Sequence, residues 1–132
     1  VFFDLMQENL GVCSLDDIAV WLNAPICSVY PGRGEAVIWG GAVHLSKEFL
    51  NHGEWGEMYG LAFTLSSGRP DTVIGPVTRL SQEHGVISLV DDASALLPGD
   101  RVAVLPVHSC LAVDLMPGLV SLDGEFFDTF RL

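Results

Sequence analysis

Positive charge is scarce in this sequence of 132 residues: six lysine and arginine residues stand against 17 acidic ones, for a formal net charge of −11. The chain has a single lysine, Lys47, and no two of its basic residues are neighbours. Binding to nucleic acid or to an anionic membrane surface requires clustered cations. The charge pattern therefore speaks against both classes of partner.

Long hydrophobic runs and paired cysteines are also lacking. No apolar run approaches the roughly 18–20 residues of a membrane-spanning helix, and the longest candidate, residues 18–30, is interrupted by Asn23 and Pro25. The cysteines are Cys13, Cys27 and Cys110. An odd and sparse set is not typical of a secreted disulfide framework, so we expect a protein of the reducing cytoplasm.

Charge of either sign is low, at 17% of residues, whereas apolar residues make up 49% and the mean hydropathy is +0.41. An ordinary soluble domain carries about 25% charged residues, and disordered chains are more polar still. The composition therefore excludes disorder and indicates apolar surface that belongs against a neighbour. We expect residues 1–132 to form one domain, cut from a larger protein.

What the sequence does contain is a series of short strand patterns separated by turn residues. The strand patterns cover residues 18–30, 35–39, 58–65, 85–90, 101–105, 110–115 and 119–122. Turn signals lie between them, among them Ser67–Pro70 and the hairpin dipeptide Asp123-Gly124. Helical signals are limited to single turns at residues 14–17 and 47–50. This pattern predicts an all-β fold, a small barrel or sandwich with one or two short helical turns.

The segment with the clearest potential for chemistry contains His108 and Cys110. If it is extended, the two side chains project from one face, because strand side chains alternate with period two; Asp114 would share that face. Imidazole nitrogen and thiolate sulfur are preferred zinc donors, and a pair of them leaves positions open for water or substrate. The alternative is that Cys110 is a small core residue and His108 a satisfied polar group.

Other polar residues give weaker signals. Lys47 is the only possible Schiff-base nucleophile, although an exposed surface lysine is the simpler interpretation. Glu83 and His84 precede a glycine, and adjacent strand residues face opposite ways, so only one is expected in a pocket. His84 could orient a ligand or take a proton, or it could be structural. His52, with Glu54 and Glu57, is expected in a solvated loop; the tryptophans are expected in the core or an interface.

Five motifs follow one another along the chain, and together they carry a family resemblance. They are Gly40-Gly-Ala-Val-His-Leu-Ser-Lys47, Tyr59-Gly60, Leu80-Ser-Gln-Glu-His-Gly85, Pro98-Gly-Asp-Arg101 and Pro106-Val-His-Ser-Cys110. In this order they resemble the C-terminal β domain of the D-serine dehydratase and D-threonine aldolase family. The resemblance runs from about Val1 to Phe130.

The resemblance implies a specific architecture and chemistry. Enzymes of that family use pyridoxal phosphate and have the alanine-racemase type of structure, in which an N-terminal (β/α)8 barrel carries the cofactor lysine and the β domain closes the active site, usually in a homodimer. The β domain binds a divalent metal through His-x-Cys in the dehydratase type and His-x-Asp in the aldolase type. The resemblance therefore implies His108 and Cys110 as ligands of zinc or another divalent metal, and it gives Lys47 no Schiff-base role.

The resemblance implies that the chain is the metal-binding domain of a D-amino-acid lyase that acts on a β-hydroxy D-amino acid. The domain alone is expected to be inactive, because the barrel carries the cofactor lysine. A D-serine dehydratase type is the first expectation, with His108 and Cys110 as metal ligands and His84 as a catalytic candidate. A D-threonine aldolase type and a non-catalytic β module for dimerisation or docking are the alternatives.

Overall fold

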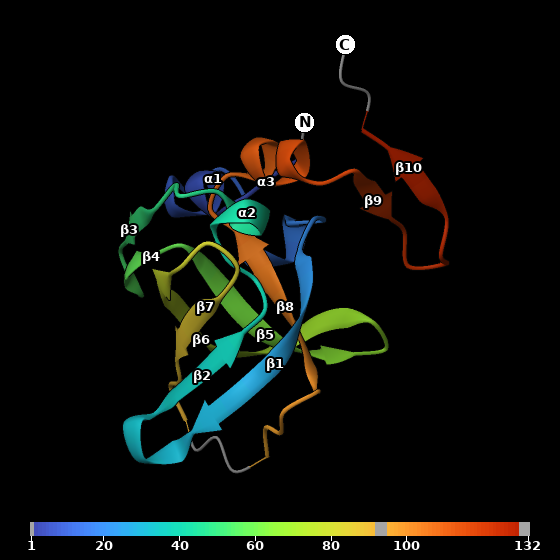
Figure 1. The fold of residues 1–132 in the computed structure, drawn as a ribbon. Coiled ribbons are helices and arrows are strands. Elements are labelled where there is room, and N and C mark those ends of the chain that lie inside the picture. The colour runs from blue at the N-terminus through green and yellow to red at the C-terminus, as the bar shows by residue number, and fades with distance from the viewer. Residues whose placement is uncertain (1, 92–94, 130–132) are drawn as a thin grey trace.

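Six antiparallel strands close into a barrel in the order β1-β2-β7-β6-β5-β8 (Figure 1). The computed structural model describes residues 2–91 and 95–129. The barrel strands are β1 (Leu22–Tyr30), β2 (Glu35–Ile38), β5 (Gly60–Ser66), β6 (Arg69–Leu80), β7 (Gly85–Ser88) and β8 (Arg101–Pro106). The prediction of a small all-β barrel is confirmed.

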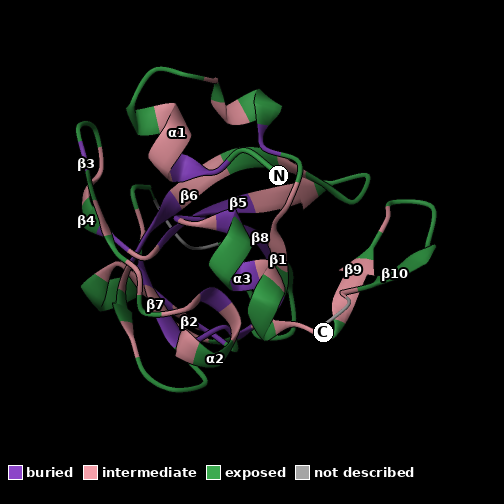
Figure 2. Ribbon diagram, turned by 90° about the horizontal axis from the view of Figure 1, so that it is seen from above, coloured by how far each residue is buried: buried purple, intermediate pink, exposed green. Residues whose placement is uncertain are grey.

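Three short helices gather at one end of this barrel (Figure 1). They are α1 (Leu5–Asn9), α2 (Ala42–Leu45) and α3 (Ser109–Leu115), and single 3-10 turns form η1 (Leu15–Asp17) and η2 (Pro31–Arg33). Two hairpins complete the fold, β3 (Leu50–His52) with β4 (Gly56–Met58) and β9 (Gly118–Val120) with β10 (Phe126–Asp128). The second hairpin projects from the barrel (Figures 1 and 2). No helix within residues 2–91 and 95–129 is long and apolar enough to cross a membrane.

One wall of the barrel is buried on both faces. Along β8, Val102 and Val104 belong to the cluster that fills the barrel interior, whereas Ala103 and Leu105 belong to a second cluster outside it. This alternation follows the period of two of a β-strand. Leu5 of α1 packs in the outer cluster, so the N-terminal segment covers the outer face of β8 and thereby lies close to the chain that leaves this strand.

The longest strand, β6, was not predicted from the sequence. Pro70, Gly75 and Pro76 interrupt its pattern with residues that signal turns. In the structure Gly75 has a φ of 146°, and a Cβ there would lie 2.0 Å from the carbonyl oxygen of Ser88. The pairing of β5 with β6 shifts register beside this glycine, between Ala62 and Phe63. Gly75 therefore lets a long strand bend around the barrel.

Several other predictions about local structure were wrong. The strand predicted for residues 110–115 is helix α3, in which Leu111, Ala112 and Leu115 are good helix formers. The helical turn predicted at residues 47–50 lies earlier, where α2 begins after Gly41 and ends at Leu45. The strand predicted from residue 18 begins only at Leu22. The turn predicted at residues 14–17 is confirmed as η1.

Candidate functional site

His108 and Cys110 lie at the start of helix α3. Strand β8 ends at Pro106, and His108, with φ of −131° and ψ of 104°, is the N-cap residue of α3. Cys110 is the second residue of the helix and is exposed, whereas His108 is half-buried. The prediction that both project from one face of a strand was therefore wrong. The two residues still follow each other at the junction between a barrel strand and a helix.

The side chains of this pair are not used to build the junction. The His108 side chain makes no capping hydrogen bond to the helix, although its carbonyl oxygen accepts one from the Ala112 amide at 3.2 Å. Cys110 is a free thiol. Asp114 is exposed one helical turn beyond Cys110. Within residues 2–91 and 95–129, no group of three or more His, Cys, Asp or Glu side chains is arranged to hold a metal, so the described part of the chain offers a pair of donors at most.

The junction is held instead by the N-terminal segment. The Asp4 carboxylate, 1% exposed, accepts a hydrogen bond from the Gln7 amide at 3.2 Å and another from the Ser109 amide at 2.9 Å. It therefore caps α1 and also holds the first residue of α3. Sequence analysis missed Asp4, although Asp4 and Gln7 have the spacing of a capping box.

Two further hydrogen bonds join the same segments. The Ser109 hydroxyl donates to the Phe2 carbonyl at 2.8 Å, and the Met6 amide donates to the Val107 carbonyl at 3.2 Å. Residues on both sides of His108 are therefore fastened to residues 2–6. No pattern in the sequence could predict these contacts, which join residues about a hundred positions apart.

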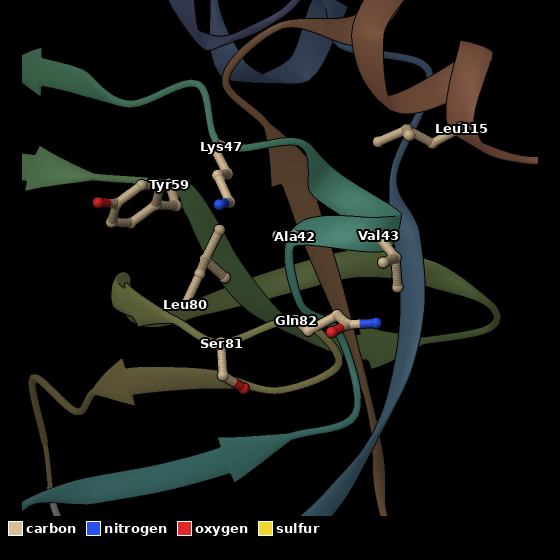
Figure 3. Close-up of a pocket in the computed structure, with 8 residues that line it drawn as sticks. All are labelled: Ala42, Val43, Lys47, Tyr59, Leu80, Ser81, Gln82 and Leu115. Atoms are coloured by element: carbon tan, nitrogen blue, oxygen red, sulfur yellow. The ribbon is translucent and has the colours of Figure 1, made fainter.

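An open pocket of about 660 Å³ lies between α2 and the turn that joins β6 to β7, and Leu115 at the end of α3 also lines it (Figure 3). Its polar residues are Lys47, Tyr59, Ser81 and Gln82. The Lys47 side chain points toward Leu80, and the Tyr59 hydroxyl points away from Lys47 (Figure 3). Lys47 is exposed, as the simpler interpretation of the sequence predicted.

His84 belongs to the turn that joins β6 to β7, beside this pocket. Ser81 and Gln82 of the turn line the pocket, and His84 is exposed and does not belong to its described lining. The backbone of His84 closes the turn: its carbonyl accepts from the Ser81 amide at 2.8 Å, and its amide donates to the Ser81 hydroxyl at 3.2 Å. A catalytic role for the imidazole stays a prediction.

The expectation of a solvated loop is confirmed for Glu54 and Glu57, which are exposed, and was wrong for His52. His52 is 7% exposed, and its Nε2 lies 2.6 Å from a carboxylate oxygen of Glu8. Its Nδ1 accepts hydrogen bonds from the amides of Glu54 and Trp55 at 3.1 and 3.3 Å. Because Nδ1 is an acceptor, Nε2 carries the proton that is donated to Glu8. His52 is therefore a structural residue.

Exposed apolar side chains are frequent near this end of the molecule. Viewed from that end, α3 and the β9–β10 hairpin carry many exposed and half-buried residues (Figure 2). In residues 2–3, in α3 and in the β9–β10 hairpin with its turn, the large exposed apolar side chains are Phe2, Phe3, Leu111, Leu115, Val120, Leu122, Phe126 and Phe127. Others, such as Tyr30, Trp39 and Leu97, lie elsewhere, so apolar exposure is not confined to this face.

Comparison with known proteins finds similarity to part of several dehydratases. Residues 19–122 match the family described as "Putative serine dehydratase domain". A D-serine dehydratase of Dictyostelium discoideum is 26% identical over 136 residues, which cover 98% of this chain and 34% of that protein. A D-serine dehydratase of Schizosaccharomyces pombe is 30% identical over 119 residues. The chain thus spans about a third of the length of the first of these relatives.

Solved structures agree in fold. D-threo-3-hydroxyaspartate dehydratase from Delftia sp. HT23 superposes with a TM-score of 0.82 at 27% identity, over 99% of this chain and 36% of that one. Two variants of that enzyme also match: a cysteine-to-alanine variant in the metal-free form, with a TM-score of 0.82, and a histidine-to-alanine variant, with a TM-score of 0.79. The substituted histidine and cysteine are two positions apart in that enzyme.

Proposed function

The chain belongs to the serine dehydratase domain family, and from that premise we propose that it is the metal-binding domain of a pyridoxal-phosphate-dependent dehydratase that acts on a β-hydroxy D-amino acid. The names of its relatives, D-serine dehydratase and D-threo-3-hydroxyaspartate dehydratase, support this reaction and this class of substrate. The proposal assigns the metal to His108 and Cys110.

The observation that carries the assignment is the His-x-Cys spacing at the start of α3. The Delftia enzyme was altered at a histidine and a cysteine with the same spacing, and the structure of its cysteine variant is in the metal-free form. In this chain the pair offers an imidazole and a free thiol at the barrel end. Neither side chain is needed to cap the helix, so both donors are available to a cation.

The chemistry of the donors fits zinc. Zinc takes nitrogen from histidine and sulfur from cysteine, and catalytic zinc sites keep a position open for water or substrate. A divalent metal held there would act as a Lewis acid that helps a hydroxyl to leave. The part of this chain is to hold the ion at a defined place through His108 and Cys110, and the remaining ligands would come from outside the pair.

The cofactor is proposed to bind elsewhere in a longer protein. The chain spans only 34% of the D-serine dehydratase of Dictyostelium, which leaves room for a barrel that carries the cofactor lysine. Pyridoxal phosphate would supply delocalisation of the negative charge that develops on the substrate. Lys47, exposed and next to an open pocket, is given no role in binding it. The exposed apolar side chains near α3 are proposed to face this barrel and a second subunit of a cytoplasmic homodimer.

Dehydration is preferred to aldol cleavage for a specific reason. The second donor is Cys110, which matches the dehydratase type, and the relatives named above are dehydratases. An assay of the natural full-length protein distinguishes the two reactions: the proposal expects ammonia and a keto acid from a β-hydroxy D-amino acid. Glycine and an aldehyde would instead establish the aldolase type, and the absence of both products would favour a non-catalytic module.

Elemental analysis tests the metal assignment. We expect about one zinc per chain in the purified natural full-length protein, and loss of that zinc in the His108→Ala and Cys110→Ala variants. His44→Ala is the matched control, since this histidine lies in α2 and its Nδ1 accepts from the Gly41 amide at 3.1 Å. Zinc that is equally present in the parent and in the double variant of His108 and Cys110 would overturn the assignment.

A further inference from the structure

We propose that Asp4 is a positioning residue for the His108–Cys110 metal pair. Its buried carboxylate holds the backbone of Ser109, the residue between the two ligands. The inference rests on the proposed metal-binding function and adds a residue to it that lies more than a hundred positions away in the sequence.

The contact between Asp4 and Ser109 is short and buried. The Ser109 amide lies 2.9 Å from Oδ2 of Asp4, and the two residues are each 1% exposed. A hydrogen bond to an ionised carboxylate is about twice as strong as a neutral one, and exclusion of water from the contact strengthens it further. The other carboxylate oxygen is occupied by the Gln7 amide at 3.2 Å, so Asp4 itself cannot rotate away freely.

The contact between Asp4 and Ser109 is part of a hydrogen-bond network around His108. On one side of this histidine the Val107 carbonyl accepts from the Met6 amide at 3.2 Å, and on the other side the Ser109 hydroxyl donates to the Phe2 carbonyl at 2.8 Å. Residues 2–6 therefore hold both neighbours of the first proposed ligand. Because the backbone on both sides of His108 is held in place, the imidazole can point in only a limited range of directions.

The side chain of His108 takes no part in capping helix α3. An N-cap residue commonly uses its own side chain to accept an amide of the first helical turn, but the His108 side chain makes no such bond. Asp4 accepts an amide of this turn in its place. The imidazole is thereby left free to bind a cation. A side chain that capped the helix at this position would not be free to do so.

Residues that orient metal ligands typically change metal affinity about 10–100-fold when they are replaced. We therefore expect Asp4→Asn to weaken zinc binding by about that factor. The asparagine side chain has one acceptor oxygen where the aspartate has two, so it cannot serve both the Gln7 and the Ser109 amides. Gln7→Ala is the matched control: it removes the acceptor for the Asp4 amide, a bond of 3.1 Å on the α1 side, and leaves Ser109 untouched.

The experiment measures zinc affinity by competition with a chelator in the natural full-length protein, together with the absorption spectrum of the cobalt-substituted protein, which reports thiolate coordination. Asp4→Asn should bind zinc about 10–100-fold more weakly and show an altered cobalt spectrum, and Gln7→Ala should keep the parent's affinity and spectrum. Thermal unfolding of the metal-free variants shows whether they fold alike.

The outcomes separate this inference from the proposed function. A parent that loses zinc on His108→Ala, while Asp4→Asn keeps the parent's affinity, overturns the positioning role alone. A parent that binds no more zinc than His108→Ala overturns both. If Asp4→Asn fails to fold, Asp4→Ser decides, because the single serine oxygen can still cap α1 and leaves the Ser109 amide without its acceptor; unchanged zinc affinity and an unchanged cobalt spectrum in that variant overturn the inference.

Discussion

The Nε2 atom of His52 lies 2.6 Å from a carboxylate oxygen of Glu8, which joins the β3–β4 hairpin to helix α1. The other ring nitrogen accepts the amides of Glu54 and Trp55 and closes the hairpin turn. Helix α1 begins at the Asp4 cap. The hairpin, the helix and the start of α3 are thus connected through a few buried polar contacts at one end of the barrel.

Replacing His52 by alanine is expected to lower the free energy of unfolding by about 1–3 kcal/mol, because it removes a buried side chain that makes hydrogen bonds to Glu8, Glu54 and Trp55. The measurement is urea unfolding followed by circular dichroism. Asn51→Ala is the control, since Asn51 is its exposed neighbour on β3. A double-mutant cycle with Glu8→Ala should show coupling; additive effects of the two replacements would contradict the contact.

Gly75→Ala is expected to destabilise the barrel by about 1–3 kcal/mol or more, because an alanine there must adopt a backbone conformation that strongly favours glycine. The added Cβ would also lie 2.0 Å from the Ser88 carbonyl oxygen. Gly32→Ala is the control, because a Cβ there meets nothing within 4 Å. Equal unfolding free energies of the two variants would show that the bend of β6 does not depend on this glycine.

The pKa of Asp123 lies below its ordinary value, because the Ser121 hydroxyl donates to the carboxylate and its own backbone amide adds to the effect. A lowered folded-state pKa stabilises the hairpin at pH values above the ordinary pKa of the unfolded chain, and this contribution is lost as the pH falls through the folded-state pKa. Ser121→Ala should raise the pKa of Asp123 toward its ordinary value in a carbon NMR titration. Ser66→Ala, at the exposed end of β5, should leave that titration unchanged; a shift with both variants would contradict this cause.

The barrel could be predicted from the sequence because its strands carry strong local signals. Residues 101–105 read as a strand, and the structure has β8 at Arg101–Pro106. The longest strand, β6, could not be predicted, since Pro70, Gly75 and Pro76 look like turns until the barrel closes around them. Helix α3 was not predicted either, because its short segment has no clear hydrophobic period. Its position is determined by contacts with residues 2–6.

The candidate site could also be predicted only in part, because long-range contacts hold it in place. His108 and Cys110 were predicted as metal ligands from their residue types, their spacing and the family resemblance, and their role as ligands stays a prediction. Asp4 was missed because its importance lies in a contact with Ser109, and such long-range contacts leave no periodic signal. The burial of His52 was not predicted, because its neighbours Glu54 and Glu57 suggested solvent and its contact with Glu8 joins residues 44 positions apart.

His84→Gln tests the remaining catalytic candidate. If the imidazole transfers a proton, kcat of the natural full-length protein should fall by about 100-fold or more. Stability should stay unchanged, because the turn uses the backbone of His84 and the hydroxyl of Ser81. Glu83→Gln is the control, because Glu83 is exposed on the same turn and is not among the residues that line the pocket. A kcat within about threefold of the parent would remove His84 from the catalytic residues and leave it a surface residue.

Zinc should protect Cys110 from alkylation. A thiolate that coordinates a metal is not free to attack iodoacetamide, so we expect the zinc-loaded natural full-length protein to react at Cys110 at least about tenfold more slowly than the chelator-treated protein. Cys27 is the internal control, because it is also exposed and lies in β1; its rate should not depend on zinc. Peptide mass spectrometry measures both sites in one sample.

His108→Ala should abolish the protection, since the thiolate alone holds zinc too weakly. Protection of Cys27 and Cys110 to the same degree would mean that zinc changes access to the whole domain, and protection that persists in His108→Ala would remove this histidine from the ligand set.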